Sequence, residues 1–222
     1  MGPRLASFLF GGSCFLCRGR AAGVLCAECE AELPRVAADA CPRCALPSPG
    51  AMLCGRCLSE PPHYDATVAA LRYEFPADTL VLALKFRGEL ALAALLAGLL
   101  AARIREAADC VVPVPLSRSR LRARGYNQAV EIARHLGRGA PALDACARSR
   151  EGAPQSELPW SERRRNVRGA FECRRLLAGA TVAVVDDVMT TGATLNELAR
   201  VLKAAGAQRV VNWVVARTPA PD

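Results

Sequence analysis

Two adjacent aspartates stand where a run of apolar residues ends, in the stretch VAVVDDVMTTGATL at residues 182–195. Neighbouring carboxylates repel each other, and the Thr-Thr-Gly after them is poor helix-forming sequence, so we expect a partner to stabilise this arrangement. Gly192 lets the backbone approach a ligand closely, and the threonine hydroxyls can donate to phosphate oxygens. A ribose 5-phosphate fits both the aspartates and the turn, because it carries a vicinal diol at one end and a phosphate at the other.

The sequence around the aspartates predicts a strand that leads through a turn into a helix. TVAVVDD is a continuous apolar run of the kind buried in parallel sheets, and GATLNELARVLKAAG after it has helical periodicity. Ligands of such sheets bind beyond the carboxyl ends of the strands, where Asp186 and Asp187 are expected, and a helix N-terminus holds phosphate well. Simple helix capping by aspartate is the alternative, but it leaves the Thr-Thr-Gly unexplained. The predicted phosphate cradle is Thr190, Thr191, Gly192, Ala193 and Thr194.

Eight of the 11 cysteines form four CxxC knuckles. Two knuckles supply four thiolates for one tetrahedral zinc ion, so the four predict two structural zinc sites. Spacers of eight and nine residues favour pairing of consecutive knuckles, although interleaved pairing stays open. Redox pairs and disulfides are weaker alternatives, since the first rarely come in fours and the second do not persist in a reducing compartment. The predicted ligands are Cys14, Cys17, Cys26, Cys29, Cys41, Cys44, Cys54 and Cys57.

The elements that must position these residues alternate between strand and helix after the proline-rich linker EPPHY at residues 60–64. This alternation predicts an α/β domain at 61–222, with a doubly wound parallel sheet and helices on both faces. A small domain at 1–60, whose folding free energy comes from metal binding, precedes it. Besides the stretch after Thr181, the expected strands are TVAALRYE, CVVPVPL and RVVNWVVAR, and the expected helices are ADTLVLALKF, the Ala/Leu segment 90–107 and NQAVEIARHLG.

The chain is basic, with a net charge of +8 from 29 Lys+Arg and 21 Asp+Glu. This charge suits phosphates, pyrophosphate or nucleic acid, and a generally basic surface has the same composition. The longest apolar run, LALAALLAGLLAA, falls short of the ~18 residues that a membrane span requires, and no signal-peptide core is present. We therefore expect a cytoplasmic protein without membrane insertion, whose oligomeric state stays open.

A family resemblance joins these features. Residues 182–194 are similar to the signature of type I phosphoribosyltransferases, which bind phosphoribosyl pyrophosphate (PRPP). Four CxxC knuckles, LRYEFPADTLVLALKFRGEL, VPVPLSRSRLRARGYNQA, PQSELPWSERRRNVRGAF and that signature occur in this order, covering nearly the whole chain. The order resembles the ComF/GntX family, the competence protein F group. The resemblance implies a type I phosphoribosyltransferase-like fold, a double zinc ribbon, a cytoplasmic bacterial protein, and a link to DNA uptake or gluconate utilisation.

Two further segments fit a pyrophosphate site. VPVPLSRSR leaves a buried strand through two prolines, and its backbone amides can turn toward an anion. The resemblance implies that Pro115, Leu116 and Ser117 form the pyrophosphate loop. RGYNQ then makes a sharp polar turn into a helix, with Arg124, Asn127 and Gln128 as candidate binding residues. A solvated basic helix start is the alternative for the arginines of this region.

Residues 148–169 are arginine-rich and have little hydrophobic pattern. Long loops inside compact domains are usually functional or disordered, so a mobile basic surface loop is the alternative here. PQSELPWSERRRNVRGAF is similar to the hood of glutamine-dependent amidophosphoribosyltransferases. By that resemblance, residues that close over pyrophosphate are Gln155, Arg163, Arg164 and Asn166. The acceptor hood expected at 60–80 contains Tyr64, Tyr73 and Phe75, which either stack a base or pack in the core.

The resemblance implies attack of a nucleophile on C1′ of PRPP while Mg²⁺-bound pyrophosphate leaves, with Asp186 and Asp187 as catalytic residues that hold the ribose hydroxyls. No motif identifies the acceptor. Two other classes stay open: a module that binds PRPP or nucleotide without turnover while its ribbons dock single-stranded DNA or uptake machinery, and a structural adaptor in a DNA-processing complex. PRPP binding lost on Asp→Asn substitution favours the enzyme, whereas salt-sensitive oligonucleotide binding that survives it favours DNA binding.

Overall fold

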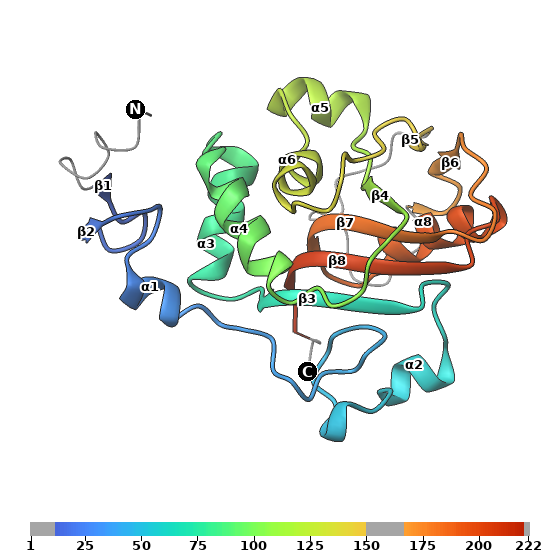
Figure 1. Cartoon of the computed structure of the whole chain (residues 1–222), viewed down its shortest axis with the longest axis horizontal. Coiled ribbons are helices and arrows are strands. Elements are labelled where there is room, and N and C mark those ends of the chain that lie inside the picture. Colours follow the sequence, from blue (N-terminus) through green and yellow to red (C-terminus); the bar gives the residue numbers. More distant parts are fainter. Residues whose placement is uncertain (1–11, 150–166, 220–222) are drawn as a thin grey trace, which may run out of the picture.

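The computed structural model describes residues 12–149 and 167–219, and its centre is a four-stranded parallel sheet (Figure 1). The strands are β3 (Ala66–Arg72), β4 (Cys110–Pro113), β7 (Thr181–Met189) and β8 (Arg209–Arg217). They lie in the order β3-β8-β7-β4. Each strand follows one of the apolar runs that predicted it, so the parallel α/β class is confirmed.

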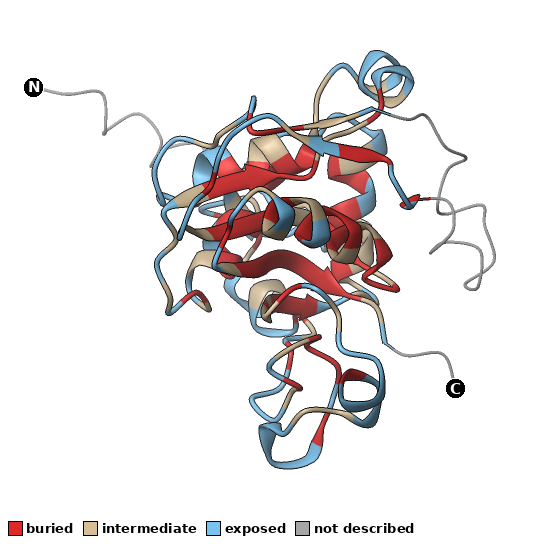
Figure 2. Ribbon diagram, turned by 90° about the vertical axis from the view of Figure 1, so that its right-hand side faces the viewer, coloured by how far each residue is buried: buried red, intermediate tan, exposed pale blue. Residues whose placement is uncertain are grey.

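Helices cover both faces of the sheet, as predicted. Successive strand residues point to opposite faces, so Ala183 and Val185 pack with one helix layer while Val182 and Val184 pack with the other. Figure 2 shows the buried strands at the centre of the molecule. One layer contains α3 (Ala77–Phe86), α4 (Ala91–Ala101) and α6 (Gln128–His135), and the other contains α8 (Ala193–Ala204).

Helix α4 ends earlier than the predicted residue 107. After Ala101 the amides of Arg103 and Ile104 bond to carbonyls three residues back, which tightens the last turn, and charged residues then break the apolar pattern. A further short helix, α5 (Arg118–Arg124), was not predicted as a separate element. Within the described ranges, no helix is long and apolar enough to cross a membrane.

A small antiparallel pair, β5 (Cys146–Arg148) with β6 (Phe171–Cys173), flanks the arginine-rich segment. Sequence patterns did not predict it, because strands of three residues are too short to show alternation. The predicted hood residues Gln155, Arg163, Arg164 and Asn166 lie outside the described residues.

In the cysteine-rich region, the described residues 12–60 form short elements: β1 (Gly12–Ser13), β2 (Arg20–Ala21), α1 (Ala27–Ala31), the 3₁₀ helix η2 (Pro49–Ala51) and α2 (Gly55–Ser59). The segment between α1 and η2 runs along the outer edge of β3. There Val36 donates its amide to the Ala70 carbonyl at 3.1 Å, and Arg72 donates to the Pro34 carbonyl at 2.7 Å. The cysteine-rich region therefore covers an edge of the main sheet.

Candidate functional site

The four knuckles form two clusters of four thiols, and each cluster joins consecutive knuckles. Within a cluster the sulfur atoms lie within 4.8 Å of one another. The Cys17 and Cys26 sulfurs are 3.7 Å apart, and those of Cys44 and Cys54 are 3.6 Å apart. Thiolates bound at about 2.3 Å around one tetrahedral Zn²⁺ lie about 3.8 Å apart, so both clusters fit zinc. The first tetrad is Cys14, Cys17, Cys26 and Cys29, and the second is Cys41, Cys44, Cys54 and Cys57.

Backbone amides favour the thiolate form at one cysteine of each tetrad. Burial acts to raise the pKa of Cys41, but N–H groups of its own ribbon outweigh this effect and lower that pKa to about 7. At Cys14 burial also acts to raise the pKa, but backbone N–H groups outweigh it and lower that pKa to about 6. Because zinc binds the thiolate, the surroundings of these two cysteines favour metal binding.

A cavity of about 630 Å³ opens beyond the carboxyl ends of β4 and β7. Its walls come from the end of α3, the exit of β4, the turn into α6 and the turn into α8, which lie far apart in the sequence. Most of the described residues that we predicted for the site line it: Pro115, Leu116, Arg124, Asn127, Gln128, Asp186, Asp187, Thr190, Gly192, Ala193 and Thr194. Ser117 and Thr191 are buried behind the wall.

The two aspartates lie at the end of β7, and a lysine that the sequence analysis missed compensates their charge. Lys85 Nζ is 2.8 Å from Asp187 Oδ2, and the Asp187 side chain is only 9% exposed. Lys85 comes from the last turn of α3 and lines the same cavity. A single cation at the end of the otherwise apolar run LVLALKF was the available signal.

Charges at this strand end are strongly coupled. The protein atoms packed around Asp186, followed by the charge of Asp187, raise the pKa of Asp186 to about 8. Burial acts to lower the pKa of Lys85, but the charge of Asp187 outweighs it and holds that pKa above its usual value. Lys85 is therefore protonated at neutral pH, and Asp186 favours its protonated form until a cation bound with a ligand displaces that proton.

The turn RGYNQ ties the exit of β4 to the start of α6. Asn127 donates its side-chain amide to the Val114 carbonyl at 2.9 Å, and its Oδ1 accepts from the Ala129 amide at 3.0 Å. Asn127 is thus the N-cap of α6 and also fixes the predicted pyrophosphate loop. Ser117 caps α5 in the same way, since its hydroxyl accepts from the Arg120 amide.

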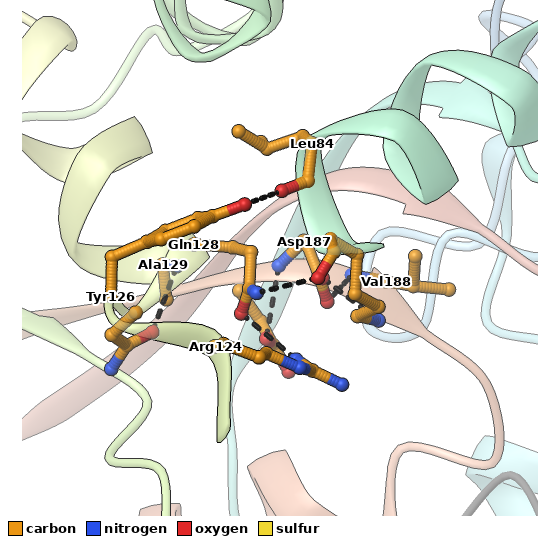
Figure 3. A network of polar contacts seen from close by, with 10 residues as sticks. Leu84, Arg124, Tyr126, Gln128, Ala129, Asp187 and Val188 are labelled. Atoms are coloured by element: carbon orange, nitrogen blue, oxygen red, sulfur yellow. Dashed lines mark hydrogen bonds and ion pairs between the residues drawn. The ribbon is translucent and has the colours of Figure 1, made fainter. Parts of the chain in front are cut away.

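The same turn also holds the end of α3, which carries Lys85 (Figure 3). Arg124 Nη1 donates to Gln128 Oε1 at 3.1 Å, and Gln128 Nε2 lies 3.5 Å from the Lys85 carbonyl. The Tyr126 hydroxyl donates to the Leu84 carbonyl. RGYNQ therefore positions the lysine that faces the aspartates.

The predicted phosphate turn leads directly into α8. Gly192 is the N-cap of that helix and has φ +79°, a conformation that favours glycine. A Cβ at this position would lie 2.8 Å from Met189 Cε and 3.1 Å from Tyr64 Oη, so these side chains would have to shift to admit it. Thr191 Oγ1 accepts from the Ala193 amide at 3.1 Å and closes the turn. The first turn of α8 thus faces the cavity with the favourable end of its dipole.

Aromatic side chains divide between the cavity rim and the core. Tyr73 and Phe86 line the cavity, and the Arg124 guanidinium lies 4.9 Å from the centre of the Phe86 ring. Tyr64 is 5% exposed and packs in the core, while Phe75 is 76% exposed. Of the three aromatics considered for an acceptor hood, Tyr73 is therefore the one that the cavity includes.

Comparisons with known proteins agree with this arrangement. The model of the Double zinc ribbon domain matches residues 5–58, and that of the Phosphoribosyl transferase domain matches residues 90–221. The DNA utilization protein YhgH of Escherichia coli is 34% identical over 222 residues, which cover 93% of this chain and 97% of that protein. YhgH of Salmonella typhimurium is 35% identical with the same coverage. The Competence protein F of Haemophilus influenzae is 31% identical over 226 residues, covering 94% of this chain and 98% of that protein.

Proposed function

The chain belongs to the ComF/GntX family, in which a double zinc ribbon precedes a phosphoribosyltransferase domain, and on this premise we propose that it binds PRPP and transfers its phosphoribosyl group. The observation that carries the proposal is one cavity that joins an aspartate pair at a strand end to a glycine turn at a helix N-terminus. These are the groups that a ribose diol and a 5-phosphate require.

In the proposed complex the 5-phosphate lies in the turn from Thr190 to Thr194, where backbone amides and hydroxyls donate to its oxygens. Asp186 and Asp187 accept hydrogen bonds from the ribose hydroxyls. Pro115, Leu116 and Arg124 line the same cavity, and in the proposed complex pyrophosphate extends toward them.

The reaction forms one bond and breaks one. A lone pair of the acceptor forms the new bond to C1′, and the bond from C1′ to the pyrophosphate oxygen breaks, with its electron pair leaving on pyrophosphate. The protein contributes position and charge: the carboxylates hold the sugar and stabilise its developing positive charge, and arginine stabilises the leaving group. Mg²⁺, which prefers phosphate oxygens and a few carboxylates, would neutralise part of the pyrophosphate charge when bound.

The acceptor is proposed to be a planar or nucleophilic group at the rim formed by Tyr73 and Phe86, which offer an aromatic surface beside the site. Relatives are named for DNA utilization and competence, so we propose that the protein acts in the cytoplasm on the DNA-uptake route. The basic chain would there meet single-stranded DNA or uptake machinery.

Calorimetric titration of PRPP with Mg²⁺ into the zinc-loaded protein tests the proposal. We expect saturable binding that weakens at least about 100-fold in Asp186→Asn/Asp187→Asn, because two charge-assisted hydrogen bonds contribute about 1.5–3 kcal/mol each. Asp144→Asn, an exposed carboxylate paired with Arg175, is the matched control and should bind normally. Equal affinity in wild type and double variant would refute the proposed site. PRPP binding without pyrophosphate release across an acceptor screen would favour the non-catalytic adaptor.

A further inference from the structure

A buried arginine joins the second tetrad to the phosphate turn. Arg217, the last residue of β8, is 3% exposed. Its guanidinium donates to the Cys44 carbonyl at 2.8 Å, to the Met189 carbonyl at 2.9 Å and to the Thr190 carbonyl at 2.5 Å. The Arg217 side chain thus donates hydrogen bonds to one residue of the second tetrad and to two residues of the turn that leads to Gly192.

A buried guanidinium is costly unless a counter-charge lies nearby. The backbone carbonyls that accept from the Arg217 guanidinium supply dipoles rather than charge. The second tetrad supplies charge, because four thiolates around one Zn²⁺ carry a net negative charge. Cys44 belongs to that tetrad, and its backbone carbonyl accepts from Arg217. The Arg217 guanidinium is therefore hydrogen-bonded to a residue of the zinc site.

A second arginine makes the same link from the surface. Arg56 stands between the ligands Cys54 and Cys57 in α2, and its Nη2 donates to the Thr191 carbonyl at 3.0 Å. Tyr64 packs beneath Gly192 from the same side. A separate cavity of about 190 Å³ behind the turn is lined by residues of the second tetrad, by both arginines and by the turn itself.

We infer that zinc in the second tetrad is the counter-charge that fixes Arg217 and Arg56, and that these two arginines act as positioning residues for the turn at 189–192. Loss of this zinc frees both guanidinium groups from their anchor and loosens the turn. The effect on the turn is independent of any ligand, whereas its effect on phosphate affinity rests on the proposed PRPP site.

The first tetrad packs against other elements. It shares a core cluster with α3 and α4, through Cys14 and the nearby Leu25 and Leu33, on the other face of the sheet. Arg18, an exposed arginine beside that tetrad, lies over Phe15 at 5.8 Å. The first tetrad therefore provides matched controls for both the metal and the arginines.

Amide hydrogen exchange of residues 189–194 and zinc content are measured together in two pairs of variants. In the first pair, Arg56→Met keeps both zinc ions but speeds exchange in the turn at least about fivefold, while Arg18→Met leaves it unchanged. Arg56→Lys restores most of the protection, because lysine retains the charge and one donor. In the second pair, Cys54→Ser and Cys17→Ser each lower zinc binding, and Cys54→Ser alone speeds exchange in the turn.

Exchange of the buried β7 residues 182–185 reports global unfolding in every variant and must stay slow. Unchanged exchange at 189–194 in Arg56→Met and Cys54→Ser would overturn the inference. Calorimetry with PRPP follows, and we expect affinity to fall about threefold to tenfold in Arg56→Met. If wild type does not bind PRPP but amide exchange at 189–194 responds to the substitutions as expected, the proposed function is refuted. The coupling between zinc and the turn is then still supported.

Discussion

The two tetrads arise from the same CxxC motif with nearly equal spacers, yet their surroundings differ. The first packs with α3 and α4, and its Cys17 is exposed. The second packs on the α8 side, and three of its four cysteines are buried. Its neighbours Arg56 and Arg217 donate to carbonyls of the turn at 189–192. The CxxC motif therefore identifies the ligands, whereas the side chains around each tetrad determine which other parts of the fold it contacts.

Substitution of Arg217 should give the largest effect on the second-tetrad side. Arg217→Met leaves several backbone carbonyls unpaired and a negative zinc site uncompensated, so the free energy of unfolding should fall by about 3–5 kcal/mol. Thermal unfolding measures the loss. Arg209→Met is the matched control at the other end of β8, since Arg209 pairs with Glu106 at a side-chain exposure near 41% and should cost at most about 1 kcal/mol. Equal losses in Arg217→Met and Arg209→Met would contradict a special role for the arginine beside the second tetrad.

The glycine of the turn provides the next test. Gly192→Ala combines an unfavourable positive φ with contacts to Met189 and Tyr64 that are too close, and should cost about 2–4 kcal/mol as well as PRPP affinity. Gly179→Ala separates the two causes, because Gly179 has φ +75° but open space around its Cβ position. This control should cost about 1 kcal/mol in urea unfolding. A Gly192 variant no worse than the Gly179 variant would mean that the turn is not packed against the second-tetrad side.

Lys85 supports the aspartates from the α3 side, which shares its core with the first tetrad. Lys85→Met leaves Asp187 without its cation, so we expect a loss of about 1–3 kcal/mol and weaker PRPP binding, with exchange of the turn at 189–194 unchanged. Denaturant unfolding, calorimetry and amide exchange measure the three quantities. Faster exchange in the turn would show that the two sides of the site are coupled and would weaken the comparison.

The smallest effect concerns pH. Asp186 retains its proton in the folded protein up to about pH 8. In the unfolded chain an aspartate loses its proton near ~3.9. The folded state therefore binds more protons between these values, and stability falls as pH rises toward 8. Asp186→Asn should remove this slope, so the melting temperature of the variant should rise relative to that of wild type as the pH increases from 5 to 8. The variant and wild type should converge near pH 5, and a constant difference at both pH values would contradict the assignment.

Local patterns predicted the four strands of the main sheet, the main helices and the cysteine tetrads, because the pattern for each lies in a short stretch of neighbouring residues. The aspartate pair and its glycine turn were also predictable, since Asp186 to Thr194 form one continuous signature that the cavity includes. The helix that supplies Lys85 was predicted, but not that the lysine would face Asp187 about 100 residues later in the chain.

The contacts of Arg56 and Arg217 could not be predicted for the same reason. Arg56 meets Thr191 across 135 positions, and Arg217 meets Cys44 across 173. In the sequence, Arg217 ends an apolar strand and Arg56 stands inside a knuckle, and both positions are typical of solvated arginines. Their role depends on which strands become neighbours in the sheet, which periodicity does not specify.

The segment that lies along the edge of β3 can also protect the chain from aggregation before folding is complete. An open sheet edge is a template on which other chains add strands and aggregate, and residues 34–36 occupy that edge here. Because the covering segment precedes β3, the ribosome releases it first, and it is available when the strand emerges. Residues 34–36 stand between the two tetrads in the sequence, so the chain that would bind zinc also shields this edge of the sheet from other chains.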